Sequence, residues 1–181
     1  MLLIKFQLTE QEYFEYNYFT AWSDPHRKHY RFFYYLKVLL LYAVVAALYL
    51  YANRDHSIWM DLGIFSIIAL LYLLMVPWLI RKSVQRRVRQ ILSQAENKHV
   101  LEACEVGLSS QGIVDKDNES ESFYKWDAIV KKAETPHAFY LYTNSYHAIV
   151  IPKRALQNEA ERAQLQDLFS TNLSLSAEYN G

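Results

Sequence analysis

Six histidines are the side chains of this sequence with the widest range of chemistry, since they can bind metals or move protons. None has the spacing of a metal site, and the cationic neighbours of His26 and His29 would repel a metal ion. His137 and His147 would meet across a predicted hairpin, but no cysteine or carboxylate signature accompanies them. We therefore expect surface histidines and no bound metal. The histidines are His26, His29, His56, His99, His137 and His147.

An acidic run at positions 115, 117, 119 and 121 alternates like the opening of a calcium loop. An EF-hand needs glycine where Ser120 stands and a bidentate glutamate where Trp126 stands. The run therefore predicts a polar hairpin tip.

Nucleophilic side chains have no catalytic setting in this sequence. Ser109 and Ser110 lack the glycine neighbours of a nucleophile elbow, and Cys104 lies in an alternating strand pattern, as a small core residue would. Only four glycines occur in 181 residues, which excludes a glycine-rich phosphate loop and a dinucleotide fingerprint. We predict no enzyme activity, no catalytic residue and no cofactor.

Two long apolar segments must anchor the rest of the chain. The first, over 32–52, contains one charged residue, Lys37, and the second, over about 60–80, carries only Asp61 at its start. A helix of 21 residues is about 31 Å long, which matches the hydrocarbon core of a bilayer. A soluble chain of this size would have too few other residues to cover two helices that are apolar all round. The segments therefore predict a transmembrane helical hairpin over 32–80.

Charge is distributed unevenly along the chain. Residues 1–98 carry 12 basic and 7 acidic side chains, whereas residues 99–181 carry 7 and 12. The acidic second part argues against binding to nucleic acid, and basic residues on both sides of the hairpin place both termini in the cytoplasm by the positive-inside rule. The side chains expected to contact membrane lipid are Arg27, Lys28, Arg31, Arg81, Lys82, Arg86, Arg87 and Arg89.

The chain divides into five parts. Residues 1–31 contain a short strand at 2–8 and an aromatic helix that begins at a Thr9–Glu12 capping box. That helix is expected to pack on a neighbouring domain or to lie at the membrane interface. The other parts are the hairpin at 32–80, a basic amphipathic connector helix at 81–98, a folded cytoplasmic domain at 99–175 and a tail at 176–181.

The folded domain shows short strands separated by turn residues. Alternation is clear where Phe139 and Leu141 interleave with Tyr140 and Tyr142. Apolar residues then recur at helical spacing over 158–173. We predict an α+β membrane protein, in which an antiparallel sheet is closed by a C-terminal helix and Trp126 fills the core.

The segments KWDAIVKKAE, FYLYT and AIVIPKRAL follow one another after a strand, a helix, two spans and a basic connector. This order resembles the YcxB-like family of bacterial membrane proteins, and Trp126 and the run from Ile151 to Arg154 are the most recognisable features. The resemblance covers most of the chain. It implies a bacterial inner-membrane protein with a cytoplasmic part similar to pleckstrin-homology-like (PH-like) domains, a curved, barrel-like sheet capped by a helix. It implies no catalytic activity.

The expected function is that of a non-enzymatic, membrane-anchored module that binds another protein at a sheet edge or in the groove beside the terminal helix. Two alternatives stay open: an immunity protein that neutralises a toxin, and a sensor of anionic lipid. The sequence leaves the identity of the protein partner and the oligomeric state open. The candidate rim for a partner or an anionic ligand is Lys131, Lys132, Lys153 and Arg154.

Overall fold

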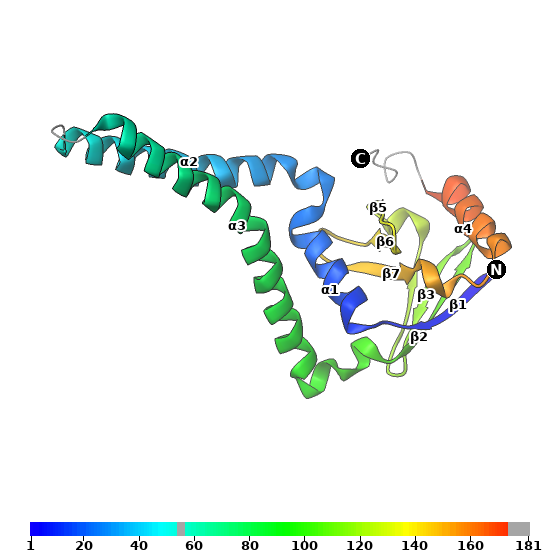
Figure 1. Cartoon of the computed structure of the whole chain (residues 1–181). Coiled ribbons are helices and arrows are strands. Elements are labelled where there is room, and N and C mark those ends of the chain that lie inside the picture. The colour runs from blue at the N-terminus through cyan, green and yellow to red at the C-terminus, as the bar shows by residue number, and fades with distance from the viewer. Residues whose placement is uncertain (54–56, 174–181) are drawn as a thin grey trace. The chain divides into compact units, whose positions relative to one another are not determined.

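The computed structural model describes residues 1–53 and 57–173 of the chain. These form two compact units, one made of residues 1–20 and 88–173 and the other of residues 21–87. We call the first the sheet unit and the second the hairpin unit, and Figure 1 shows the elements of both.

Two long helices make up most of the hairpin unit. Helix α2 is Lys28–Ala52 and follows a short 3₁₀ turn at Pro25–Arg27, and helix α3 is Ile58–Ser93. Helix α3 runs without a break through Pro77 and past the end of the expected second span. The expected second span and the start of the connector are therefore one continuous helix.

Aromatic residues form the seam between α2 and α3. Tyr35, Tyr42 and Tyr49 recur every seven residues, so they lie on one face of α2. Tyr35 packs edge-on against Tyr72, with ring centroids 6.5 Å apart, and Tyr42 and Tyr49 pack against Phe65 at 5.8 and 5.5 Å. The Tyr42 hydroxyl also donates a hydrogen bond to the backbone oxygen of Phe65 at 2.9 Å. Ring packing therefore holds the hairpin together.

The outward faces of both helices are apolar and exposed. None of the side chains of α2 is buried, and in the most apolar 18-residue windows of the two segments only 0% and 6% of residues are buried. The 25 residues of α2 give a length of about 37 Å. Both helices are long and apolar enough to cross a membrane.

The sheet unit contains two antiparallel sheets and two longer helices. The first sheet has the order β1-β2-β3-β4 and the second has the order β5-β6-β7. The strands are β1 Leu2–Gln7, β2 Ala103–Ser109, β3 Gly112–Lys116, β4 Glu121–Tyr124, β5 Lys131–Glu134, β6 Ala138–Tyr142 and β7 Ala148–Pro152. Helix α1 is Glu10–Tyr18 and helix α4 is Glu159–Asn172, and shorter helical turns lie at Phe19–Ser23, Ala95–Leu101, Trp126–Ala128 and Lys153–Ala155.

The α+β class, the antiparallel pairing and the terminal helix are confirmed, but the barrel is not closed. Among the described residues no strand pairing joins one sheet to the other. The chain between β4 and β5 forms the 3₁₀ turn Trp126–Ala128 instead of continuing the ladder. The turn places Trp126 in the core, where its indole N–H donates to the backbone oxygen of Ser109 at 2.9 Å and its ring packs against Phe169. The expected core role of Trp126 is confirmed.

The N-terminal segment belongs to the sheet unit. Strand β1 pairs with β2 in the register Leu2↔Leu108 to Gln7↔Ala103, and the expected capping box of Thr9 and Glu12 starts α1. This grouping differs from the expected division, in which residues 1–31 stood apart from the later domain. Side-chain alternation predicted the strand but carried no information about its partner.

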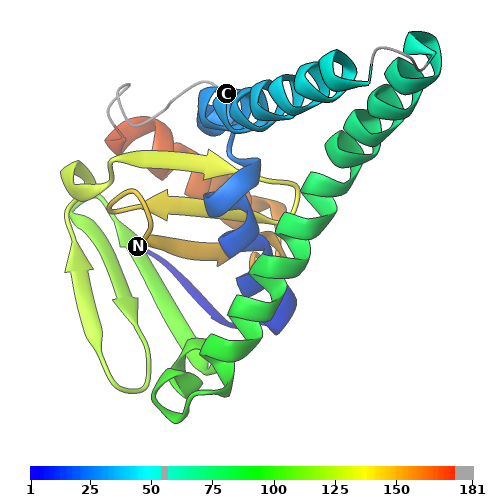
Figure 2. The ribbon, with the colours of Figure 1, turned by 90° about the vertical axis from the view of Figure 1, so that its left-hand side faces the viewer.

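Helix α1 covers the outer face of the second sheet, as Figure 2 shows. Tyr16 packs against Tyr140 and Tyr142, with ring centroids 5.6 and 6.5 Å apart. Because the core lies against the other face, every residue of β6 and β7 is buried. The aromatic helix therefore has a packing role, as expected, but the sheet on which it packs belongs to its own unit and not to a neighbouring domain.

The Tyr16 hydroxyl offers a test of this packing. It donates to the backbone oxygen of Tyr146 at 2.6 Å and accepts from the buried backbone N–H of Ala148 at 3.1 Å. Tyr16→Phe should lower the free energy of unfolding by about 1–3 kcal/mol, because the Ala148 N–H loses its partner. Denaturant unfolding of the full chain in detergent, followed by circular dichroism, measures this. Tyr13→Phe is the control, since its hydroxyl has no hydrogen bond to the described residues, and equal losses for the two variants would contradict the assignment.

Candidate functional site

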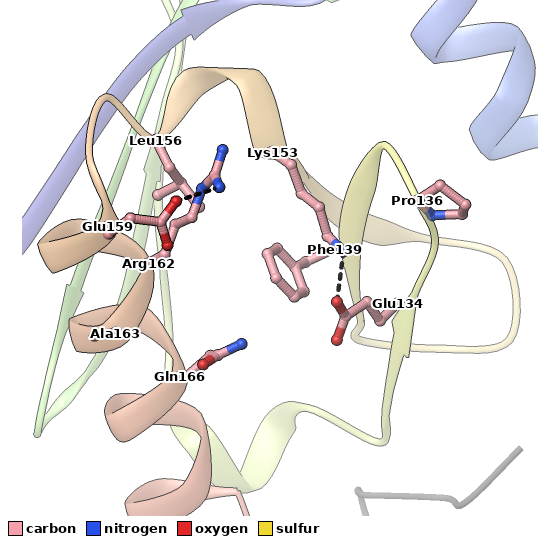
Figure 3. Close-up of a pocket in the computed structure, with 9 residues that line it drawn as sticks. All are labelled: Glu134, Pro136, Phe139, Lys153, Leu156, Glu159, Arg162, Ala163 and Gln166. Carbon is pink, nitrogen blue, oxygen red and sulfur yellow. Dashed lines mark hydrogen bonds and ion pairs between the residues drawn. The ribbon is translucent and has the colours of Figure 1, made fainter.

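A groove of about 440 Å³ lies beside α4 in the sheet unit (Figure 3). Its walls are one side of α4, the end of β5 with the turn that follows it, and the helical turn after β7. We call it the α4 groove. Its lining residues are Glu134, Pro136, Phe139, Lys153, Leu156, Glu159, Arg162, Ala163 and Gln166.

The local sequence explains how α4 forms a wall of this groove. The Asn158 side chain caps the helix by accepting from the Glu161 backbone N–H at 2.8 Å. Leu165 and Phe169, one turn apart, point into the core and fix the rotation of the helix. That rotation leaves Arg162 and Gln166, also one turn apart, beside the groove.

Two ion pairs line the groove around an aromatic side chain. Lys153 Nζ is 2.5 Å from Glu134 Oε1 and lies 4.8 Å from the centroid of the Phe139 ring. Arg162 Nη1 is 2.7 Å from Glu159 Oε1. Both cations therefore have a carboxylate beside them, and the groove combines an apolar surface with nearly balanced charge. Figure 3 shows the two pairs facing the groove from the turn region and from α4.

A second hollow, next to α1, adjoins the groove and shares Pro136, Lys153 and Arg162 with it. There Arg154 binds Glu12 through two hydrogen bonds, Nε to Oε1 at 2.6 Å and Nη2 to Oε2 at 2.7 Å. It also donates to the backbone oxygen of Gln7 at 2.7 Å. Arg154 thus joins the turn after β7 to both β1 and α1.

The electrostatics of this contact follow from its geometry. Partial burial alone would raise the pKa of Glu12, but the hydrogen bonds from Arg154 and Thr9 outweigh it and hold that pKa below its usual value. The hydrogen bond to Glu12 raises the pKa of Arg154. The charged pair is therefore the favoured state at neutral pH.

The four residues of the expected rim do not share one surface. Lys131 and Lys132 are successive residues of β5, and their ammonium groups lie over Tyr142 on one face and Phe169 on the other, at 5.0 and 5.3 Å. Lys153 lies near Lys132, because Phe139 and Phe169 are in contact at 5.6 Å. Arg154 points towards α1. Binding of an anionic ligand by these residues stays a prediction.

The basic residues expected at the membrane surface lie at the ends of the two long helices. Arg31 donates to the backbone oxygens of Trp22 and Asp24, which holds the turn before α2, and Arg89 pairs with Glu10 at 3.2 Å. Lys82 lies 5.8 Å from the Trp78 ring centroid. Their contact with lipid stays a prediction. The exposed members are Lys28, Arg81, Lys82, Arg86, Arg87 and Arg89.

The expected meeting of His137 and His147 is wrong. The register of β6 and β7, from Ala138↔Pro152 to Tyr142↔Ala148, places these histidines at opposite ends of the hairpin. Within the described ranges no three histidine, cysteine or acidic side chains could hold a metal ion.

The expected polar hairpin tip and the inert cysteine also have structural explanations. Asp117 accepts from the backbone N–H groups of Glu119 and Ser120 at 2.8 and 2.6 Å, which fixes the turn between β3 and β4. Burial, together with the nearby charges of Asp115 and Asp117, raises the pKa of the Cys104 thiol to about 12. Such a thiol is protonated at neutral pH and is a poor nucleophile.

Sequence reasoning expected a groove beside the terminal helix but did not identify most of the residues that line it. Glu134, Arg162 and Gln166 carried no motif, although helical spacing from Leu165 and Phe169 predicts which side of α4 they share. The partners of Lys153 and Arg154 lie 19 and 142 residues away in the sequence, and no local pattern indicates such pairs.

The fold and groove define a class: an α+β protein with an apolar helical hairpin inserted after its first strand and helix. Residues 108–169 match the sequence model of the YcxB-like protein family. The resemblance drawn from the sequence is therefore confirmed over this segment, which contains β3 to β7 and most of α4. No curated protein and no solved structure matches the chain.

The Arg154–Glu12 contact should couple the N-terminal segment to the turn after β7. In a double-mutant cycle, Glu12→Gln and Arg154→Met should show a coupling energy of about 1–2 kcal/mol, because two charge-assisted hydrogen bonds join them across a half-exposed site. The Glu10→Gln and Arg89→Met cycle is the matched control, since that pair is exposed and has one hydrogen bond. Its coupling should be below about 0.5 kcal/mol.

The same contact predicts a pH dependence. The pKa of Glu12 is lower in the folded protein than its usual value, so its stabilising effect is complete above the unfolded pKa of about 4.3 and is lost as the pH falls through the folded pKa. Unfolding measured from pH 7 down to the acid limit of solubility should show a smaller loss of stability for Glu12→Gln than for the unchanged protein. Parallel curves would contradict the role of the Glu12 charge.

Proposed function

We propose that this chain is a non-enzymatic module of the bacterial inner membrane, whose cytoplasmic sheet unit binds a segment of another protein in the α4 groove. The single observation that carries the proposal is the composition of that groove. Phe139 and Leu156, which are 5% and 4% exposed, form its apolar floor. On either side of this floor stands an ion pair in which the cation and the carboxylate neutralise each other.

The groove favours a protein segment over an anionic head group. A head group that carries phosphate requires cations without internal partners, whereas Lys153 and Arg162 each have a carboxylate within 2.7 Å. A short peptide offers one apolar side chain for the surface around Phe139 and polar main-chain groups for the paired charges. Lipid sensing is therefore the weaker candidate.

The order of elements supports a PH-like character for the sheet unit. After β1 and the hairpin, the chain completes a four-stranded antiparallel sheet, then a three-stranded one, and ends with α4 against the core. This is the order that the family resemblance implies. Strand β5 is the outer strand of its sheet, and its last residue, Glu134, lines the groove, so a bound segment would lie near a sheet edge.

Strand pairing supports one part of the proposed topology, an even number of membrane crossings, independently of the positive-inside rule. Strand β1 precedes the hairpin and β2 follows it, yet the two are hydrogen-bonded neighbours. The chain must therefore cross the bilayer an even number of times between them. Two crossings satisfy this requirement. Which side β1 and β2 share is a separate question, and the basic helix ends favour the cytoplasm by the positive-inside rule.

The topology can be tested by labelling single cysteines. In a Cys104→Ala background, Ser57→Cys, in the short connection before α3, should react with a membrane-impermeant maleimide added to intact spheroplasts. Ser110→Cys, in the exposed turn between β2 and β3, should react only after permeabilisation. The opposite pattern, or equal labelling of both sites, would overturn the topology.

Binding in the groove can be tested by photo-crosslinking in native membranes. A benzoylphenylalanine at Gln166, inside the groove, should give a discrete adduct with one protein, whereas the same group at exposed Gln164, outside it, should not. Ala163→Trp, which fills the groove, should abolish the adduct, and Gln164→Trp should leave it unchanged. Adducts with lipid alone, or equal adducts at both positions, would overturn the proposal.

A further inference from the structure

Another pocket, of about 370 Å³, lies within the sheet unit and is separate from the α4 groove and from the hollow that adjoins it. It opens where the end of β3, the turn between β6 and β7, and α1 approach one another. We call it the β3 pocket. The lining residues that carry the argument are Phe6, Tyr13, Tyr16, Asp115, Tyr146 and His147.

Asp115 lies on a face of the first sheet that is mainly apolar, although its neighbour on β4 is Ser122. Its neighbour across the ladder is Val106, and the next neighbour on β1 is Ile4. Directly opposed residues of an antiparallel sheet project to the same face. Val106 and Ile4 are 1% and 2% exposed in the core, so Asp115 places a carboxylate on the inner face of the sheet.

This carboxylate differs from the other acidic groups around it. Asp117, in the turn between β3 and β4, accepts hydrogen bonds from Glu119 and Ser120 within that turn. Glu119 Oε2 lies 3.9 Å from His99 Nδ1. Asp115 has no hydrogen bond or ion pair with the residues that the structure describes. Burial, and secondly the charge of Asp117, raises its pKa, whereas the proximity of His147 lowers it. An inward carboxylate without a partner is costly unless a cation reaches it.

Aromatic rings surround the approach to Asp115. Tyr13 and Tyr16 come from α1, Phe6 from β1 and Tyr146 from the turn between β6 and β7. The Tyr16 hydroxyl is fixed by its two backbone hydrogen bonds, which gives this wall a definite shape. Aromatic faces attract organic cations, and the attraction grows when the cation is withdrawn from water. A metal ion does not suit the pocket, because no three suitable ligands converge among the described residues.

We propose that the β3 pocket binds an organic cation, an ammonium or guanidinium group on a short apolar carrier, with Asp115 as its counterion and the aromatic rings as its walls. The cation comes either from a small free amine or from a lysine or arginine side chain of another protein. Both sources share the same chemistry, and the pocket is separate from the α4 groove.

Calorimetric titration of the purified full chain in a non-ionic detergent tests this inference. The probes are n-butylammonium, propylguanidinium and the neutral butyramide, together with blocked Gly-Lys-Gly and Gly-norleucine-Gly peptides. The cations should bind and the neutral analogues should not. Asp115→Asn should weaken binding by about tenfold or more, because it removes the charge and keeps the shape. Asp127→Asn, at an exposed position, should bind as the unchanged protein does.

Two further measurements separate the possible outcomes: the thermal stability of Asp115→Asn and the cation binding of a variant in the α4 groove. Without ligand, Asp115→Asn should unfold at the same temperature as the unchanged protein or higher, since it removes a partly buried charge on the inner face of the sheet. Ala163→Trp in the α4 groove should leave cation binding intact. Binding of free amines identifies a small-molecule site, and binding of the lysine peptide alone identifies a protein side chain. No binding by any cation, equal binding of butyramide, or equal binding by Asp115→Asn would overturn the proposal.

Discussion

The hairpin of β6 and β7 has two apolar faces, and both must be covered. Phe139, Leu141, Ile149 and Ile151 meet α4 and the first sheet on one side, while the other side rests on α1. Because α1 lies at the start of the chain, the covering of this hairpin requires the segment before the two long helices to pack against the strands that follow them. Three features hold the N-terminal segment in this position: the capping box, the Tyr16 hydrogen bonds and the Arg154 contact.

Sequence reasoning recovered those parts of the fold whose signals are local. The capping box at Thr9, the strand at 2–8 and the helix at 158–173 rest on hydrogen bonds or spacings within a few residues, and the structure has each of them within one or two residues. The pairing of β1 with β2 joins residues about 100 positions apart, as in Leu2↔Leu108. The contacts of Arg154 with Glu12 and Gln7 join residues 142 and 147 positions apart. Such contacts have no periodic signature, because tertiary packing alone determines them.

The α4 groove and the β3 pocket differ in how their charged side chains are paired. In the α4 groove each cation has a carboxylate beside it, so the charges of the lining residues balance. Such a groove distinguishes ligands by their shape and has little preference for either sign of charge. In the β3 pocket one carboxylate stands on an apolar face without such a neighbour. If the pocket binds a cation as we propose, that cation offsets the free energy that this placement costs. The pocket would then select its ligand by the sign of the charge.

The long separation between β1 and β2 has a consequence for biosynthesis. At synthesis rates of about 5–20 residues per second, the roughly 100 residues that separate the two strands in the register Gln7↔Ala103 take about 5–20 seconds to make. During that interval the first strand and α1 have no sheet to join, and the two apolar helices are synthesised. Under the proposed topology, the first sheet can be completed only after both helices have crossed. A chain whose second helix failed to cross would leave β1 and β2 on opposite sides of the bilayer, with unpaired strand edges.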